Sequence, residues 1–66
     1  MPTIFFYGPD LDKDKRRELI SRFTAAASEL TGINERAFVV YLQATRRDEV
    51  GVGGKLLEDR YNESEE

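Results

Sequence analysis

Pro2 follows the initiator methionine and could do acid–base chemistry through its own nitrogen. Met1 is expected to be removed because the next residue is small, which leaves a secondary amine in place of an amide. An α-amino group titrates at about 7.7–8.0 in model peptides, and a general base works best when its pKa lies near the working pH. The chain has no His and no Cys, so Pro2 is the predicted general base. Taken alone, a second-position proline is a short motif that methionine processing explains equally well.

Several charged side chains of the sequence could assist such a base. Lys13, Arg46 and Arg47 are the candidates for binding an anionic substrate, and an arginine would do so through two parallel N–H groups. Asp48 and Glu49 could divide acid and base roles between them if their environments differ. Charge runs of this kind are also typical of a solvated surface.

Gly51-Val52-Gly53-Gly54 is a glycine-rich segment that permits positive φ angles. A phosphate-binding loop is one interpretation, but the spacing is not G-x-G-x-x-G and no strand-to-helix unit surrounds it. The segment therefore predicts a tight hairpin near the C-terminus.

Three regular elements must position these groups. Residues Thr3 to Tyr7 are β-branched and aromatic and predict a strand. A helix is expected from the N-cap Asp12 to about Thr31, with Gly32 just beyond its end. Ala37 to Ala44 predicts a second strand. The expected apolar stripe of the helix consists of Leu19, Ile20, Phe23, Ala27 and Leu30.

The order strand, helix, strand predicts an α/β fold built on a parallel βαβ unit with a right-handed crossover. Both strands are apolar on both faces, whereas one helix covers only one face of a two-stranded sheet. The uncovered face and the open strand edges predict a homo-oligomer. We expect one domain over residues 1–57, followed by a polar, acidic tail over residues 58–66 that is frayed unless a neighbouring segment pins it.

Composition limits the remaining classes of function. The 66 residues carry a formal net charge of −3 and no basic stripe, so no nucleic-acid partner is expected. No apolar stretch is long enough to span a membrane, and no basic region precedes the first apolar residues, which predicts a cytoplasmic protein. The absence of His and Cys removes the commonest metal ligands. We therefore expect no metal site.

The motifs taken together resemble the 4-oxalocrotonate tautomerase family of the tautomerase superfamily. The resemblance runs from Pro2 to Leu57 and rests on the Met-Pro start, the strand–helix–strand order and Gly51-Val52-Gly53-Gly54-Lys55-Leu56. It implies a βαβ subunit with a short C-terminal hairpin, dimers that share a four-stranded sheet, and usually hexamers formed as trimers of dimers. It also implies a cofactor-free isomerase in which Pro2 moves a proton in enol–keto or dienol–enone interconversion of 2-hydroxy or 2-oxo acids.

Three positions depart from the family pattern. The family places an arginine just after the first strand, where this chain has no cation before Lys13. The family's second arginine falls on Val39, and its aromatic residue before the glycine motif falls on Val50. The substrate site is therefore expected to use Lys13, Arg46 or Arg47, together with Val50.

These departures leave three hypotheses open. The first is a tautomerase with Pro2 as base and a small anionic substrate. The second is a hydratase or dehalogenase in which Asp48 or Glu49 activates water. The third is a non-catalytic oligomeric binding protein on the same fold, since a fold does not fix a function.

Overall fold

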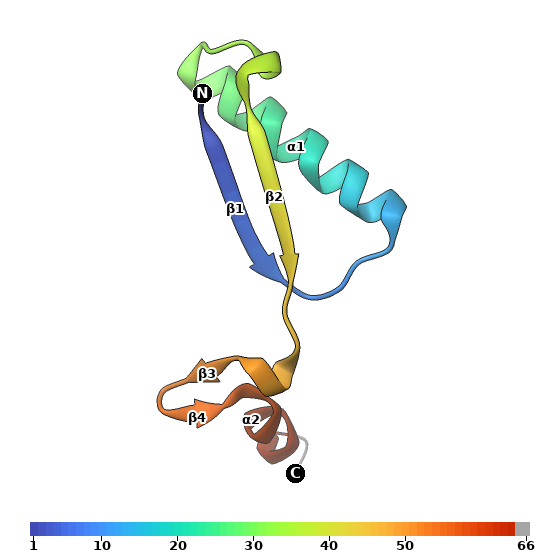
Figure 1. Cartoon of the computed structure of the whole chain (residues 1–66), viewed down its shortest axis with the longest axis vertical. Helices are drawn as coiled ribbons and strands as arrows, with labels where there is room; N and C mark the ends of the chain where they lie inside the picture. The colour runs from blue at the N-terminus through green and yellow to red at the C-terminus, as the bar shows by residue number, and fades with distance from the viewer. Residues whose placement is uncertain (65–66) are drawn as a thin grey trace.

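The computed structural model describes residues 1–64, with side chains through Tyr61. Strand β1 (Thr3–Gly8), helix α1 (Lys13–Thr31) and strand β2 (Val39–Ala44) follow one another. The two strands lie side by side and parallel, and α1 packs across one face of the sheet (Figure 1). Thr3 pairs with Val39 at one end of the ladder, and Gly8 pairs with Ala44 at the other. The α/β class and the βαβ unit are confirmed.

Helix α1 begins and ends at residues suited to these positions. The Asp12 side chain accepts a hydrogen bond from the Lys15 backbone N–H at 2.8 Å, which satisfies one of the free donors of the first turn. Gly32 has φ 76° and ends the helix, and its N–H donates to the Ser28 carbonyl. A left-handed residue at this position favours glycine because a Cβ atom would be strained there. Both predicted ends of the helix are correct.

The side chains between the sheet and α1 are apolar, but they remain partly exposed to solvent. Ile4 and Phe6 alternate with exposed neighbours along β1 and lie half-buried on the helix side. The Phe6 ring packs against the Phe23 ring of α1, with centroids 5.5 Å apart. At the far end of the predicted apolar stripe, Leu30 is 87% exposed. Helix α1 therefore covers one face of the sheet only in part.

The other face of the sheet is open. Phe5 and Tyr41 stack there with ring centroids 5.1 Å apart, and Tyr7 beside them is 68% exposed. No residue with a described side chain is fully buried. The accessible surface is 5560 Å² for 7.6 kDa, against about 4300 Å² for a compact monomer of that mass. The radius of gyration is 15.5 Å, against about 11 Å for a compact domain of this length.

The second strand starts later than the sequence predicts. Asn34 caps a short 3₁₀ turn, η1 (Glu35–Ala37), by accepting a hydrogen bond from the Arg36 backbone N–H at 2.9 Å. Phe38 then connects this turn to β2, so Ala37 is not part of the strand. The local side-chain cap outweighs the strand preference of the following residues.

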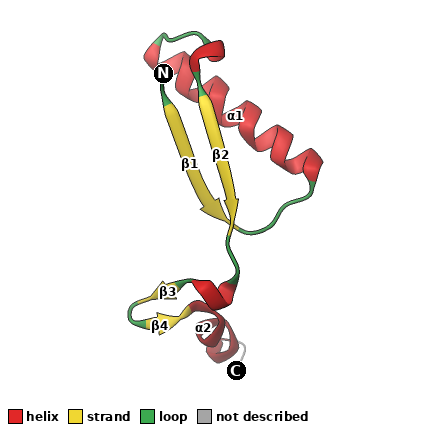
Figure 2. Cartoon of the chain, viewed as in Figure 1, coloured by secondary structure: helices red, strands yellow, loops and turns green. Residues whose placement is uncertain are grey.

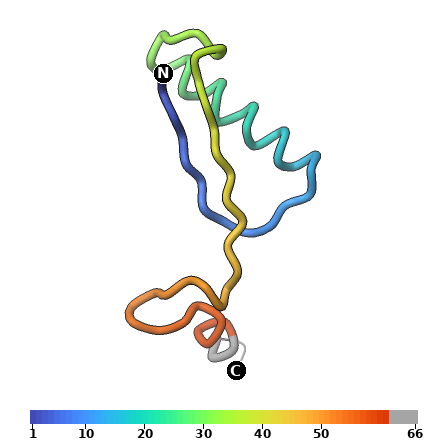
Figure 3. Tube along the Cα trace, in the orientation of Figure 1, coloured from blue at the N-terminus to red at the C-terminus, as the bar shows by residue number. Residues whose placement is uncertain are grey.

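A separate small unit follows β2, reached through a short connection at the end of the sheet (Figures 1 and 3). It consists of a 3₁₀ turn η2 (Arg47–Glu49), strands β3 (Gly51–Val52) and β4 (Lys55–Leu56), and helix α2 (Leu57–Ser64), as Figure 2 shows. The hairpin prediction is confirmed, and Gly53 and Gly54 form its turn with φ 61° and 83°.

Residues 58–64 of the expected tail belong to α2. The Leu57 N–H donates to the Val50 carbonyl at 2.7 Å, which attaches the start of the helix to the segment before the hairpin. Residues 65 and 66 of the predicted tail lie outside the described residues.

Candidate active site

Pro2 lies half-buried at the beginning of β1. Its carbonyl accepts a hydrogen bond from the Val39 N–H at 3.0 Å, so the ladder extends to this residue and fixes its backbone against β2. Met1 precedes it and is 91% exposed. Removal of Met1 would free the Pro2 nitrogen without loss of the hydrogen bond that holds its carbonyl.

The predicted cations lie at the opposite end of the sheet from Pro2. Arg46 and Arg47 follow the last residue of β2, which is six residues long, and a strand rises about 3.3 Å per residue. About 20 Å of strand therefore separates them from Pro2 within one chain. Lys13 starts α1 on the other side of the Gly8 turn. One copy of the chain does not bring the predicted base and the predicted cations together.

Arg46, Arg47 and Val50 do come together around one cleft. This cleft of about 640 Å³ lies between the end of the sheet and the C-terminal unit, and Lys13 is not among its lining residues. We call it the C-terminal cleft. It is lined by Tyr7, Gly8, Pro9, Asp10, Thr45, Arg46, Arg47, Asp48, Val50, Leu57, Glu58 and Tyr61.

The charge of Arg46 is compensated inside the chain. Its guanidinium donates to the Asp48 carboxylate at 2.7 Å and lies 4.0 Å from the Glu49 carboxylate. The same contacts hold both carboxylates against a cation. Nothing in this arrangement favours activation of a water molecule by Asp48 or Glu49.

Arg47 is arranged differently. Its Cζ lies over the Tyr61 ring, 3.8 Å from the ring centroid, and no carboxylate with a described side chain lies within ion-pair distance of it. The sequence interpretation missed Tyr61, which it assigned to the frayed tail. One signal was available, because Tyr61 is the one large apolar residue in the sequence of that tail and stands four residues after Leu57, the spacing of one helix face.

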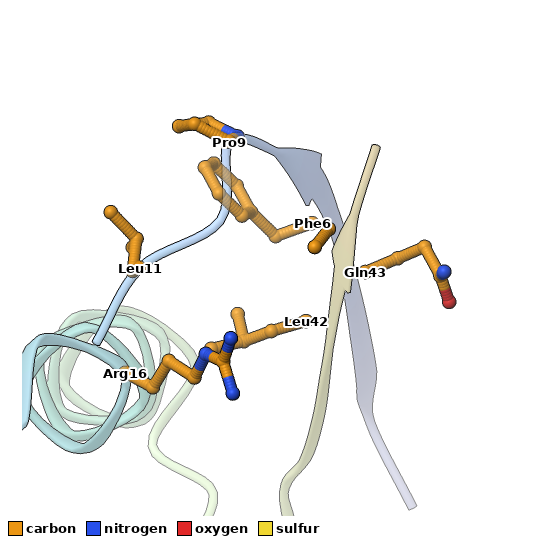
Figure 4. Close-up of a pocket in the computed structure, with 7 residues that line it drawn as sticks. Phe6, Pro9, Leu11, Arg16, Leu42 and Gln43 are labelled. Carbon is orange, nitrogen blue, oxygen red and sulfur yellow. The ribbon is translucent and has the colours of Figure 1, made fainter. Parts of the chain in front are cut away.

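A smaller pocket of about 170 Å³ lies between the sheet and the start of α1. Phe6 and Leu42 point into it from neighbouring strands, whereas Gln43 points away from the helix (Figure 4). Arg16 reaches into the pocket from α1, and its guanidinium is paired with the Asp10 carboxylate. This pocket therefore offers an apolar wall and a cation that already has a partner.

Metal-binding clusters and membrane-spanning helices are both absent from the described part of the chain. No group of three or more acidic side chains there is arranged to hold a metal ion. No helix there has the length and apolar character needed to cross a membrane.

Comparison with known proteins assigns the family. The family model described as tautomerase enzyme matches residues 2–60. The chain is 37% identical over 46 residues to the 2-hydroxymuconate tautomerase of Bacillus subtilis (strain 168), covering 70% of this chain and 74% of that protein.

Solved structures agree with this assignment. DmpI from Archaeoglobus fulgidus superimposes with a TM-score of 0.81 at 40% identity, covering 88% of this chain and 100% of that one. YwhB, described as a homologue of 4-oxalocrotonate tautomerase, also gives a TM-score of 0.81, at 30% identity over 88% of this chain and 97% of that one. The matched segment includes Pro2, the βαβ unit and the hairpin, and the chain therefore belongs to the tautomerase family.

Proposed function

We propose that this chain is a cofactor-independent tautomerase that moves a proton between the enol and keto forms of a small 2-hydroxy or 2-oxo acid. The observation that carries the proposal is the family match over residues 2–60, which begins at Pro2. The named activity of the Bacillus subtilis relative makes 2-hydroxymuconate the first substrate to test. We propose a cytoplasmic location.

Pro2 would act as the base after removal of Met1. Its neutral amine takes the proton from the 2-hydroxyl group of the dienol, and the same proton is returned to a carbon of the conjugated chain, so the reaction is an isomerisation with no net change in atoms. The hydrogen bond from the Val39 N–H to the Pro2 carbonyl supports this role, since it holds the base in a fixed position beside β2.

The complete site would need a second copy of the chain. Antiparallel association of two sheets along their open edges places unlike ends side by side, which brings Pro2 of one copy toward the arginines of another. The open aromatic face, the large surface and the elongated shape support such an association. We propose a homo-oligomer, with the hexamer as the size to test by native mass spectrometry.

The first experiment combines intact mass with turnover on the same sample. We expect the mass of a chain without Met1 and conversion of 2-hydroxymuconate, followed by its ultraviolet absorbance. Pro2→Ala should lower kcat/KM by about 10²–10⁴-fold, the usual contribution of general acid–base catalysis. A variant that retains Met1 should be inactive, because its Pro2 nitrogen is an amide.

Unchanged turnover in Pro2→Ala would overturn the role of Pro2. A correctly assembled wild-type protein that converts no 2-hydroxy or 2-oxo acid would instead favour a non-catalytic binding protein.

A mixed-oligomer experiment tests whether the site is shared between copies. A Pro2→Ala chain and an Arg46→Ala/Arg47→Ala chain are unfolded together and refolded in equal amounts. If base and cation come from different copies, about a quarter of the sites regain both groups by random assembly. If both groups come from one copy, no site is restored, and the shared site is disproved.

A further inference from the structure

We propose that Arg47 is the cation that binds the substrate carboxylate, and that Tyr61 is the residue that positions it. This inference rests on the proposed function, because it names the anion-binding part of the same site. It also assigns a role to α2 (Leu57–Ser64), for which the sequence predicts none.

The three predicted cations differ in whether a carboxylate already pairs with them and in whether they line the cleft. Arg46 is held by the carboxylates of Asp48 and Glu49. Lys13 does not line the C-terminal cleft. Arg47 lines the cleft, and no described carboxylate lies within ion-pair distance of it. Its charge is the one in the cleft that an incoming carboxylate could neutralise.

The contact with Tyr61 leaves the hydrogen-bonding groups of Arg47 usable. A guanidinium over an aromatic face is attracted by the ring through its flat side, and its N–H groups at the rim can still donate two parallel hydrogen bonds to a carboxylate. The 3.8 Å separation of Cζ from the ring centroid is that of direct contact. Tyr61 therefore restricts the position of Arg47 without competing for its donors.

Tyr61 is itself fixed relative to the cleft. It stands four residues after Leu57, whose N–H donates to the Val50 carbonyl at 2.7 Å. Leu57, Tyr61 and Val50 all line the cleft. One backbone hydrogen bond thus ties the helix that carries Tyr61 to the loop that carries Arg47.

The lining of the cleft indicates the class of ligand. Val50 and Leu57 give an apolar wall beside the guanidinium, which suits a short hydrocarbon chain ending in a carboxylate. The carboxyl groups of Asp10, Asp48 and Glu58 also line the cleft and disfavour a second negative charge there. We infer that the cleft takes one carboxylate end of the substrate, while the reacting end extends toward Pro2 of another copy.

The test measures binding of cis,cis-muconate, a six-carbon dicarboxylate without the 2-hydroxyl group, to the full-length oligomer by calorimetry. Arg47→Ala should weaken binding by about 10- to 100-fold, the usual loss for a hydrogen bond to a charged group. Tyr61→Leu should weaken it by about two- to fivefold, the range for an exposed cation–π contact. Tyr61→Phe should bind like wild type because it keeps the ring.

Arg17→Ala is the matched control, since it removes an exposed arginine of α1 that is not among the residues lining the cleft. Native mass spectrometry and circular dichroism of each variant report assembly and folding. In turnover, Tyr61→Leu should raise KM and leave kcat close to wild type, whereas a purely structural role, which reduces the amount of folded protein, would lower the apparent kcat and leave KM unchanged.

Several results would overturn the inference. These are wild-type protein that binds no muconate, wild-type affinity in Arg47→Ala, or equal losses in Tyr61→Phe and Tyr61→Leu. Because binding is measured without turnover, Arg47-dependent binding with no Pro2-dependent reaction would disprove the proposed function and leave this inference standing. Pro2-dependent turnover without Arg47-dependent binding would overturn this inference and leave the proposed function standing.

Discussion

The βαβ unit (residues 3–44) and the C-terminal unit (residues 47–64) are ordered by different interactions. In the βαβ unit, six residue pairs form a parallel ladder, and aromatic side chains join sheet to helix. In the C-terminal unit the strands are two residues long, and the contacts include ion pairs with the neighbouring Arg46, a cation–π contact and a backbone hydrogen bond to Val50.

This difference separates two tasks within 66 residues. The apolar unit supports the backbone at Pro2, and the polar unit holds Arg47 at the other end of the sheet. Mutations in the first should therefore change global stability, whereas mutations in the second should change substrate affinity. Substitutions in each unit test whether stability and substrate affinity separate in this way.

The largest effect is expected from Phe23→Ala in α1. Its ring packs against Phe6 and joins the helix to the sheet. Loss of the ring should lower the free energy of unfolding by about 3 kcal/mol, the lower end of the range for phenylalanine because the side chain is half-buried. Urea unfolding at fixed protein concentration measures it. Val52→Ala in β3 is the comparison, and an equal loss there would show that the two units are not energetically distinct.

The most direct comparison uses two glycines with similar positive φ angles. Gly32 ends α1 at φ 76° and Gly54 lies in the hairpin turn at φ 83°, and a Cβ added at either would meet no atom within 4 Å. Alanine therefore costs only backbone strain at both sites, about 1–2 kcal/mol.

The readouts of these two variants should differ. Gly32→Ala should lower the urea midpoint of the whole protein. Gly54→Ala should instead reduce hydrogen-exchange protection in the hairpin and raise KM, with a smaller change in the midpoint. Identical shifts of midpoint and KM in both variants would contradict the separation of tasks.

A smaller effect is expected from Asp12→Ala. This change removes the acceptor for the Lys15 N–H and should cost about 1 kcal/mol, as for other helix N-caps. Asp12→Asn keeps an acceptor and should retain wild-type stability. Thermal unfolding followed by circular dichroism distinguishes them, and equal melting temperatures for the two variants would rule out the cap as the cause.

The smallest effect is expected from Arg17→Ala. Its ion pair with Asp14 spans 3.0 Å, and the Arg17 side chain is 70% exposed. Exposed pairs of this spacing contribute about 0.3–0.5 kcal/mol, so urea unfolding should change little. A loss above about 1 kcal/mol would mean that this helix surface is covered in the assembled protein.

The βαβ unit could be predicted because its signals are local and repeated. A run of β-branched and aromatic residues defines β1, and Asp12 and Gly32 define the ends of α1. The start of β2 was misplaced because a single side-chain contact at Asn34 decides it. The hairpin was predictable from its glycines, since few other residues adopt their φ angles.

The candidate site was predictable only in part. Pro2, Arg46, Arg47 and Val50 were chosen from residue type and family resemblance, and the structure gathers the last three around one cleft. Their distance from Pro2 follows from the parallel pairing of the two strands, whereas their convergence with Tyr61 on one cleft depends on how the chain leaves β2 and was not predictable. The helix that carries Tyr61 was missed because its composition is polar and its contacts lie outside its own segment.

In the proposed homo-oligomer, the open aromatic face of the sheet would make stability depend on protein concentration. No described residue is fully buried in a single copy, so contacts between the proposed copies would supply further apolar burial, and stability would rise with the amount of protein present. Dilution would then act as a denaturant, and specific activity would fall below a threshold concentration that a self-sufficient monomer does not have. The level of synthesis of such a protein sets the fraction that is folded as well as the number of sites.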